Sequence, residues 1–467
     1  MRAVSGESDS ATDEAGLFPI VADHPSAYLP GDRRRAIATG ATIPSRAHGA
    51  ALFADISGFT PLTEALANEL GSQRASEVLT GHLNRAFHAV IAELDRFGGE
   101  VIYFSGDAIT CWLDGDDGLR AAASGLGMQD AVRREGAITT PGGLSLQLGL
   151  KVAVAVGPAR RFVVGDPGVQ LIDVLAGELV DLIAALEEIT EKGEVLIHES
   201  GLSALVGRAE LGASRASDAA GSGSVVERLL GPVPEARSPG ARGEELPGDL
   251  SRPWLLPAVH ERLSTGQVEF LAELRPAYPL FVSFSGIDYD RDEGASEKLD
   301  EFVRAAQTAL TGLGGNVLTL TLGDKGAYLH GVFGTPIAHE DDADRACAGA
   351  LALIALEQTT AARNIRVGIA HGRLRSGTYG HAQRRTFGCL GDVVNLAARL
   401  MTAAPAGEIY ASELVRRHAR ERFAWAELEP LQLKGKAADV TAFALTGTSG
   451  RHSRSRRYEL PIVGRTG

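Results

Sequence analysis

The hydrophobic and polar positions in the first third of the chain predict a strand, a long helix and a hairpin. Residues 50–59 begin as an unbroken apolar run, which is typical of a buried strand. Thr60 and Pro61 suit the N-cap and the first position of a helix. Apolar residues three and four positions apart through residues 72–97 predict an amphipathic helix, and two glycines follow it. Residues 100–113 then predict two strands joined by a tight turn.

The alternation of strands and helices continues toward the middle of the chain. Residues 144–157 predict a strand, residues 174–189 a helix and residues 194–200 a further strand. Residues 206–252 are rich in Gly, Ala, Ser, Pro and Arg, and we expect a flexible loop or linker there. Residues 253–274 predict a connecting helical stretch.

The same pattern returns in the second half of the chain. Four matches carry the repeat: 278–287 matches 50–59, 314–333 matches 98–113, 365–372 matches 150–157, and 390–400 matches 176–186. The last three matches are offset by nearly the same number of residues, which indicates an internal duplication. We therefore expect an α/β (α+β) chain built from two tandem domains.

This duplication gives the expected domain boundaries. They are an N-terminal tail and lead-in (1–47), a first domain (48–205), a linker and connecting helix (206–275), a second domain (276–447) and a basic C-terminal tail (448–467). Within the lead-in, we expect the run Arg33–Arg35 to form part of a solvated surface.

Composition and charge narrow the class of protein. The 467 residues contain 46 Lys and Arg against 59 Asp and Glu, a net charge of −13, which excludes a globally basic surface for nucleic acid. Three scattered cysteines form neither a disulfide framework nor a zinc site. No apolar run is long enough to span a membrane, and the acidic, Ser-rich N-terminus is unlike a signal peptide. We expect a cytoplasmic protein with no membrane partner.

Two carboxylates in the first copy suggest a metal site. Asp55 stands where a strand runs out, and Asp107 stands in the turn of the predicted hairpin. Paired carboxylates on neighbouring strand ends suit Mg²⁺, and the helix N-terminus after Asp55 can receive a phosphate. Two turn-capping aspartates without a ligand are the alternative.

The second copy carries complementary residues. Ser283 replaces the first of the two carboxylates, so this copy has lost a metal ligand. It has Asn395 and Arg399 four residues apart on one helix face, where the first copy has Asp181 and Ala185. Packed head to tail, the two copies would form one complete site and one inactive site.

These motifs resemble a known family. FADISGFT (53–60), GGEVIYFSGDA (98–108), IRVGIAHG (365–372) and the stretch 380–401, which contains VNLAARL, are similar to class III nucleotidyl cyclases. The tandem arrangement and the linker stretch 256–276 resemble soluble adenylyl cyclase and its bacterial relatives. The resemblance implies two ferredoxin-like, palm-type domains that pair within one chain, so that the protein is a monomer.

The resemblance also implies an activity, the conversion of ATP to cyclic AMP and pyrophosphate for intracellular signalling. Two divalent cations, Mg²⁺ or Mn²⁺, would be held by Asp55, Ile56 and Asp107. Asn395 would orient the ribose, and Arg399 would stabilise the pentavalent phosphorus.

Six further positions are implied to bind substrate, namely Phe59, Thr60, Lys151, Lys434, Thr319 and Gly388. Lys151 and Lys434 would meet the triphosphate, with Lys436 as the runner-up to Lys434. Thr319 and Gly388 stand where the family selects its base. Neither offers the usual charged donor, and Cys389 lies one position away from a guanine-selecting cysteine.

Other readings stay open. One alternative is that the two domains form a catalytically silent nucleotide-sensing regulatory module for a C-terminal ATPase or effector. Another is that the protein is a guanylate cyclase. The bicarbonate-responsive positions of the mammalian enzyme correspond to Tyr103 and Ala184, so we expect no activation by that route. The ending PIVGR resembles the entrance to a downstream ATPase-type domain, which predicts that the chain continues in a longer protein.

Overall fold

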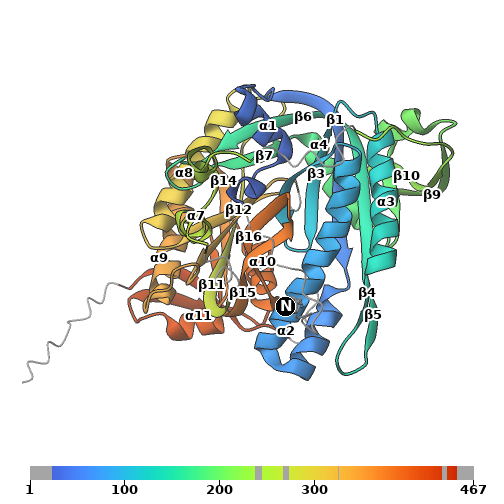
Figure 1. The fold of residues 1–467 in the computed structure, drawn as a ribbon. Coiled ribbons are helices and arrows are strands. Elements are labelled where there is room, and N and C mark those ends of the chain that lie inside the picture. The colour runs from blue at the N-terminus through green and yellow to red at the C-terminus, as the bar shows by residue number, and fades with distance from the viewer. Residues whose placement is uncertain (1–23, 237–244, 267–272, 324–325, 434–438, 450–467) are drawn as a thin grey trace, which may run out of the picture.

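The structure is a computed structural model that describes residues 24–236, 245–266, 273–323, 326–433 and 439–449. The predicted N-terminal tail up to residue 23 and nearly all of the predicted C-terminal tail, including PIVGR, lie outside these ranges. Two mixed sheets, each covered by helices, confirm the expected α/β fold. In Figure 1 the first domain lies on the right and the second on the left.

The first sheet runs in the order β2-β3-β1-β6-β8-β10-β9, with β7 paired to β6. Its strands are β1 (Arg46–Ser57), β2 (Glu100–Ser105), β3 (Ala108–Asp114), β6 (Gly149–Val164), β7 (Ile172–Ala176), β8 (Val195–His198), β9 (Ala209–Ser217) and β10 (Gly221–Leu229). Its helices are α2 (Phe59–Arg96), α3 (Leu119–Glu135), α4 (Glu178–Ile189), α5 (Glu199–Leu202) and η2 (Ser203–Leu205), and a small hairpin joins β4 (Ala137–Thr139) to β5 (Ser145–Gln147).

The second sheet repeats this order as β12-β13-β11-β14-β17-β19-β18, with β15 paired to β11 and β16 paired to β15. Its strands are β11 (Glu273–Ser285), β12 (Asn316–Thr321), β13 (Ala327–Phe333), β14 (Arg363–Ile369), β15 (Gly372–His381), β16 (Arg384–Leu390), β17 (Ile409–Ser412), β18 (Phe423–Glu427) and β19 (Ala442–Thr448). Its helices are α8 (Ala295–Thr311), α9 (Asp342–Ala355), η5 (Leu356–Gln358), α10 (Asp392–Ala403) and α11 (Glu413–His418). The duplication read from the sequence is therefore a duplication of topology.

Local sequence explains where the helices next to the site begin. Gly58 precedes α2 with a φ of 108°, a conformation that favours glycine, so the helix starts one residue before the predicted Thr60 cap. Gly71 bends the same helix, with a φ of 73°. Gly177 and Gly391 introduce α4 and α10 in the same way, which places these two helices at equivalent positions.

Each domain extends an arm into the other. The outer half of β6 together with β7 forms the first arm, and its Phe162 and Val174 are buried in the core of the second domain. The hairpin β15–β16 forms the second arm, and its Tyr379 is buried in the core of the first domain against Phe87 and Phe104. This exchange fixes the two domains head to tail.

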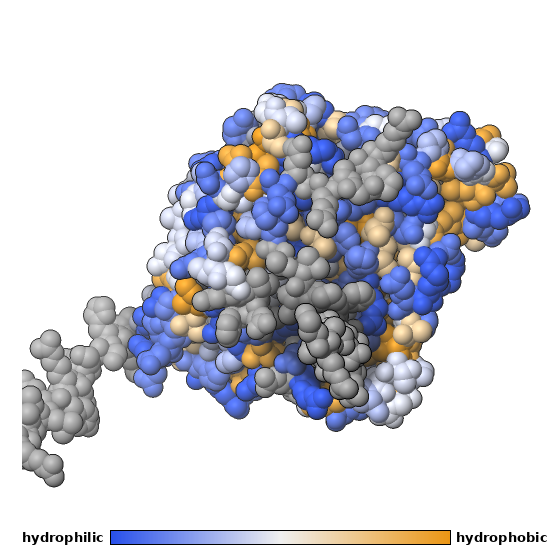
Figure 2. All heavy atoms as spheres, in the orientation of Figure 1, coloured by the Kyte–Doolittle hydropathy of each residue, from blue (hydrophilic) through white to orange (hydrophobic). Residues whose placement is uncertain are grey.

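The prediction of a flexible stretch beginning at residue 206 is wrong for its first part. Residues 209–229 form β9 and β10, which extend the first sheet at its edge. Figure 2 shows apolar side chains at this end of the molecule, and Val206, Leu211 and Leu230 are exposed there. The connection to β11 contains α6 (Gly248–Ser251), η3 (Arg252–Trp254) and α7 (Pro257–Ser264).

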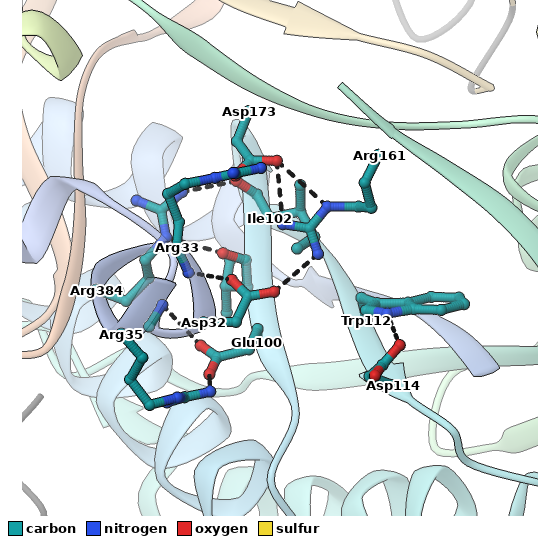
Figure 3. A network of polar contacts seen from close by, with 12 residues as sticks. Asp32, Arg33, Arg35, Glu100, Ile102, Trp112, Asp114, Arg161, Asp173 and Arg384 are labelled. Carbon is teal, nitrogen blue, oxygen red and sulfur yellow. Dashed lines mark hydrogen bonds and ion pairs between the residues drawn. The ribbon is translucent and has the colours of Figure 1, made fainter. Parts of the chain in front are cut away.

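The arginine run of the lead-in is only partly solvated, which corrects the expectation for it. The lead-in forms η1 (Pro25–Tyr28) and α1 (Gly31–Thr39), and Arg34 is buried. Arg33 donates from Nε to Asp173 at 2.7 Å, and Asp173 also accepts from the buried Arg161. Figure 3 shows this network between α1 and the first sheet. Of the three arginines, Arg35 alone is largely exposed, although it pairs with Glu100.

No helix in the described ranges is long and apolar enough to cross a bilayer.

Candidate active site

A cavity of about 600 Å³ lies between the two domains. The first domain contributes its predicted metal-binding carboxylates and the second contributes residues from β12, β16 and α10. The predicted site residues that line it are Asp55, Asp107, Lys151, Thr319, Gly388 and Asn395. The structure thus brings together residues that lie as far apart in the sequence as β1 and α10.

The two carboxylates are neighbours because β1 and β3 are paired. Asp55 lies opposite Ala108 in this ladder, and the Ile56 amide donates to the Asp107 carbonyl at 3.2 Å. Asp107 lines the cavity. Desolvation by the surrounding protein, together with the negative charge of the nearby Asp55, raises the pKa of its carboxyl group. Glu187 contributes in the same direction.

This acidic pair fits divalent cations. Two neighbouring carboxylates are oxygen donors that suit Mg²⁺ or Mn²⁺, because the cation neutralises their charge. The Ile56 side chain is fully buried in the core of the first domain, and because it is a hydrocarbon, the backbone carbonyl is the group of this residue that suits a cation.

Lys151 faces the carboxylates from the neighbouring strand. It lies opposite Asp55 in the β1–β6 ladder, and its Nζ donates to Glu187 Oε1 on α4 at 3.0 Å. Both side chains line the cavity, as does Glu188. The lysine predicted to meet the triphosphate is therefore held by a carboxylate in this structure.

Helix α10 presents only part of its predicted pair to the cavity. Asn395 lines the cavity together with Val394 and Ala398. Arg399 is not among the described lining residues; its Nη1 is buried and has no hydrogen-bond partner within the described ranges.

Three other predicted residues lie elsewhere. Phe59 is buried in the core of the first domain, and it is not among the described residues that line the cavity. The side chain of Thr60 lies outside the described part of the chain, and so do Lys434 and its runner-up Lys436.

Next to Thr319, the cavity contains residues that the sequence analysis did not single out. His330 on β13 lies opposite Phe281 on β11 and opposite Thr319 on β12. Its ring stacks on Phe281 with centroids 4.4 Å apart, and both residues line the cavity with Tyr379. The available signal was a lone histidine at an inward position of an apolar strand.

The two domains also meet at the pseudosymmetric position. Ser283 lies opposite Arg366 as Asp55 lies opposite Lys151, so these positions correspond as the sequence indicated. Beside it, the buried Tyr103 donates its hydroxyl hydrogen to the Leu322 carbonyl at 2.9 Å.

The arrangement of two duplicated domains around one shared cavity agrees with what the comparisons with known proteins find. Residues 319–447 match the family model of the adenylate and guanylate cyclase catalytic domain. The first domain repeats the topology of the second. Residues 319–447 therefore match a cyclase catalytic domain, and the chain as a whole is similar to the class III nucleotidyl cyclases.

The chain is also similar to adenylate cyclase type 10. It is 23% identical to the human protein over 391 residues and 24% identical to the rat protein over 395 residues. Each alignment covers 76% of this chain, which spans about a quarter (24%) of the length of these relatives.

One solved structure covers both domains. A class III adenylyl cyclase-like ATP-binding protein from Pseudomonas aeruginosa has a TM-score of 0.55 and 13% identity, over 81% of this chain and 87% of that protein. This likeness supports the tandem fold.

Proposed function

We propose that the protein is an adenylate cyclase, which converts ATP to cyclic AMP and pyrophosphate at the cavity between the domains. The observation that carries this proposal is that one cavity contains the acidic pair Asp55 and Asp107 from the first domain and Asn395 from the second. Neither domain has both sets, so one site of this composition forms per chain. A cytoplasmic signalling role is part of the proposal.

The first domain would hold the phosphates. Asp55, Asp107 and the Ile56 carbonyl would hold two divalent cations, which supply charge that activates the ribose 3′-hydroxyl and neutralises the leaving phosphates. Lys151 would exchange its bond to Glu187 for the terminal phosphates of ATP. The N-terminus of α2 lies directly after β1, and its free amides would be available to a phosphate bound there.

The second domain would orient the ribose and stabilise the reacting phosphate. The 3′-oxygen bonds to the α-phosphorus, the bond to the pyrophosphate oxygen breaks, and the hydroxyl proton is released. The Asn395 amide would hold the ribose so that this attack is in line. Arg399 has an unpartnered Nη1, and a side-chain rotation toward the cavity would bring it to the negative charge on the α-phosphate.

The test is cyclic nucleotide production by the purified chain with ATP or GTP and Mg²⁺ or Mn²⁺. Asp55→Ala and Asn395→Ala should each reduce turnover at least about 100-fold, because each removes a group that acts on the reacting atoms. Ser283→Ala is the matched control at the pseudosymmetric position and should retain activity. Product formation that survives Asp55→Ala would overturn the proposal.

A second candidate is a nucleotide-sensing module without turnover. It is favoured by the position of Arg399, which does not line the cavity within the described residues, and by the uncharged Thr319 and Gly388. Saturable ATP binding with no product under any of the four conditions would establish this second function.

A further inference from the structure

The cavity contains a buried imidazole that the proposed chemistry does not use. The His330 side chain is buried, and its Nε2 has no hydrogen-bond partner within the described part of the chain. A buried polar nitrogen without a partner costs about 1–3 kcal/mol, so a ligand that supplies the partner would gain from it. His330 lines the same cavity as Asn395 and the acidic pair.

The strand register aligns His330 with the position expected to select the base. His330 and Thr319 are directly opposite in the β12–β13 ladder, so their side chains lie on the same face of the sheet. Phe281, opposite His330 on the other side, stacks on the imidazole with an interplanar angle of 8° and fixes the plane of the ring. The imidazole is therefore held in one orientation beside Thr319.

The imidazole is neutral at physiological pH. Burial lowers the pKa of His330 to about 3, and no carboxylate offsets this effect. A neutral imidazole has one donor and one acceptor nitrogen. With its proton on Nδ1, Nε2 is a pure acceptor.

The second base-selecting position, Gly388, has no side chain with which to compete. A Cβ atom at Gly388 would lie 3.0 Å from the Tyr379 ring and hydroxyl, so Tyr379 occupies the space that a larger residue would need. Burial raises the pKa of this phenol and keeps it protonated. The base end of the cavity is thus built from neutral groups, in contrast to the charged phosphate end.

We propose that His330 selects the base of the substrate, with Nε2 accepting a hydrogen bond from the 6-amino group of adenine. This inference rests on the proposed function only in that a purine nucleotide occupies the cavity. Guanine has a carbonyl oxygen at its 6-position, and that oxygen would meet a donor only if the imidazole proton moved from Nδ1 to Nε2. A site that hydrogen-bonds a substrate group discriminates against an analogue that lacks the group.

The test measures binding without turnover. The affinities of ATP, GTP and purine riboside 5′-triphosphate, which has no 6-amino group, are compared by calorimetry with Ca²⁺ in place of Mg²⁺. His330→Leu should weaken ATP binding about 10-fold, which corresponds to the loss of one good hydrogen bond. The same variant should leave the affinity for the purine analogue unchanged, and His330→Gln should recover part of the ATP affinity.

Unchanged ATP affinity in His330→Leu, or equal weakening of ATP and the purine analogue, would overturn the inference. Stability is checked by thermal unfolding. The Tm of His330→Leu should not lie below that of the parent protein, because the change replaces an unpartnered buried nitrogen with an apolar group. If the Leu variant is nevertheless destabilised, the comparison of affinities is made with His330→Gln. If the protein prefers ATP over GTP in binding but forms no product, the proposed cyclase activity is refuted and this inference stands. If the protein forms cyclic AMP but His330→Leu leaves the preference for ATP unaltered, this inference is refuted and the cyclase activity stands.

Discussion

At the scale of single residues, the cavity combines charges that are unfavourable until a ligand arrives. Asp55, Asp107, Glu187 and Glu188 all line it, and Lys151 is the basic side chain among the described lining residues. Such a site is expected to depend on pH and on cations for its stability as well as for its function.

The raised pKa of Asp107 predicts how a cation stabilises the protein. Because its folded-state pKa lies above the unfolded value, the stability from this protonated carboxyl is present at acidic pH and is lost as the pH rises through the folded-state pKa. Mn²⁺ binds the ionised pair, so the increase in Tm caused by Mn²⁺ should be larger at pH 8 than at pH 6. Differential scanning calorimetry measures it, and an Asp107→Asn variant that retained this pH dependence would contradict the assignment.

The ion pair between Lys151 and Glu187 predicts a gain of affinity. Both side chains are mostly buried, with 26% and 21% exposed, so the pair competes with the phosphates for the lysine. Glu187→Gln should tighten ATP binding about 3-fold or more, whereas Glu188→Gln removes the same charge without releasing Lys151 and should change it less. Equal effects of the two variants would show that only the total charge matters.

At the scale of elements, the hydrophobic pattern predicted the helices and strands whose formation depends on local sequence. The hairpin β2–β3, the helices α4 and α10 and the repeated strand order follow from periodicity and turn residues. The strands β9 and β10 did not follow, because they lie at a sheet edge and are rich in Gly, Ala and Ser, a composition typical of loops.

The site residues divide in the same way. Motif positions such as Asp55 and Asn395 were predictable and line the cavity. The environments of His330 and the buried Arg34 were not predictable, because they depend on residues distant in the sequence. Phe281 stacks on His330, and Glu100 and Asp95 lie near Arg34. Burial of a polar side chain is a tertiary property that one segment of sequence does not determine.

The exchanged arms predict that a change in one domain's strand weakens the other domain. Phe162 belongs to β6 but is buried in the core of the second domain. Phe162→Ala should lower the free energy of unfolding by about 3–5 kcal/mol, since it leaves a cavity in that core. Val163→Ala on the same strand is the control, because Val163 is 37% exposed and its truncation should have little effect. Urea unfolding followed by tryptophan fluorescence and circular dichroism measures both, and equal losses would refute the arm exchange.

At the scale of the whole molecule, the two domains are related by topology but not by chemistry. The second arm and α10 complete the cavity from one side, while Tyr103 and Leu322 are joined at the pseudosymmetric position. In the proposed active site, each copy therefore supplies a different half of the residues.

This asymmetry predicts that one nucleotide binds per chain. A Cβ atom at Gly323 would lie 2.6 Å from Val180 of α4, which shows how closely the two domains approach at the pseudosymmetric position. Calorimetric titration with α,β-methylene ATP, which cannot lose its leaving group, should give a stoichiometry of one. A second site of comparable affinity would contradict this prediction, and the predicted lack of bicarbonate activation would then need re-examination.

The exchange of arms has a consequence for how the chain can be divided. Each domain lacks part of its own interior when it is alone, since Tyr379 completes one core and Phe162 completes the other. A chain severed between residues 230 and 256 should therefore yield two fragments that are unstable apart and that assemble into one working molecule when they are made together. Such complementation would turn the protein into a split reporter, whose signal requires that both halves meet.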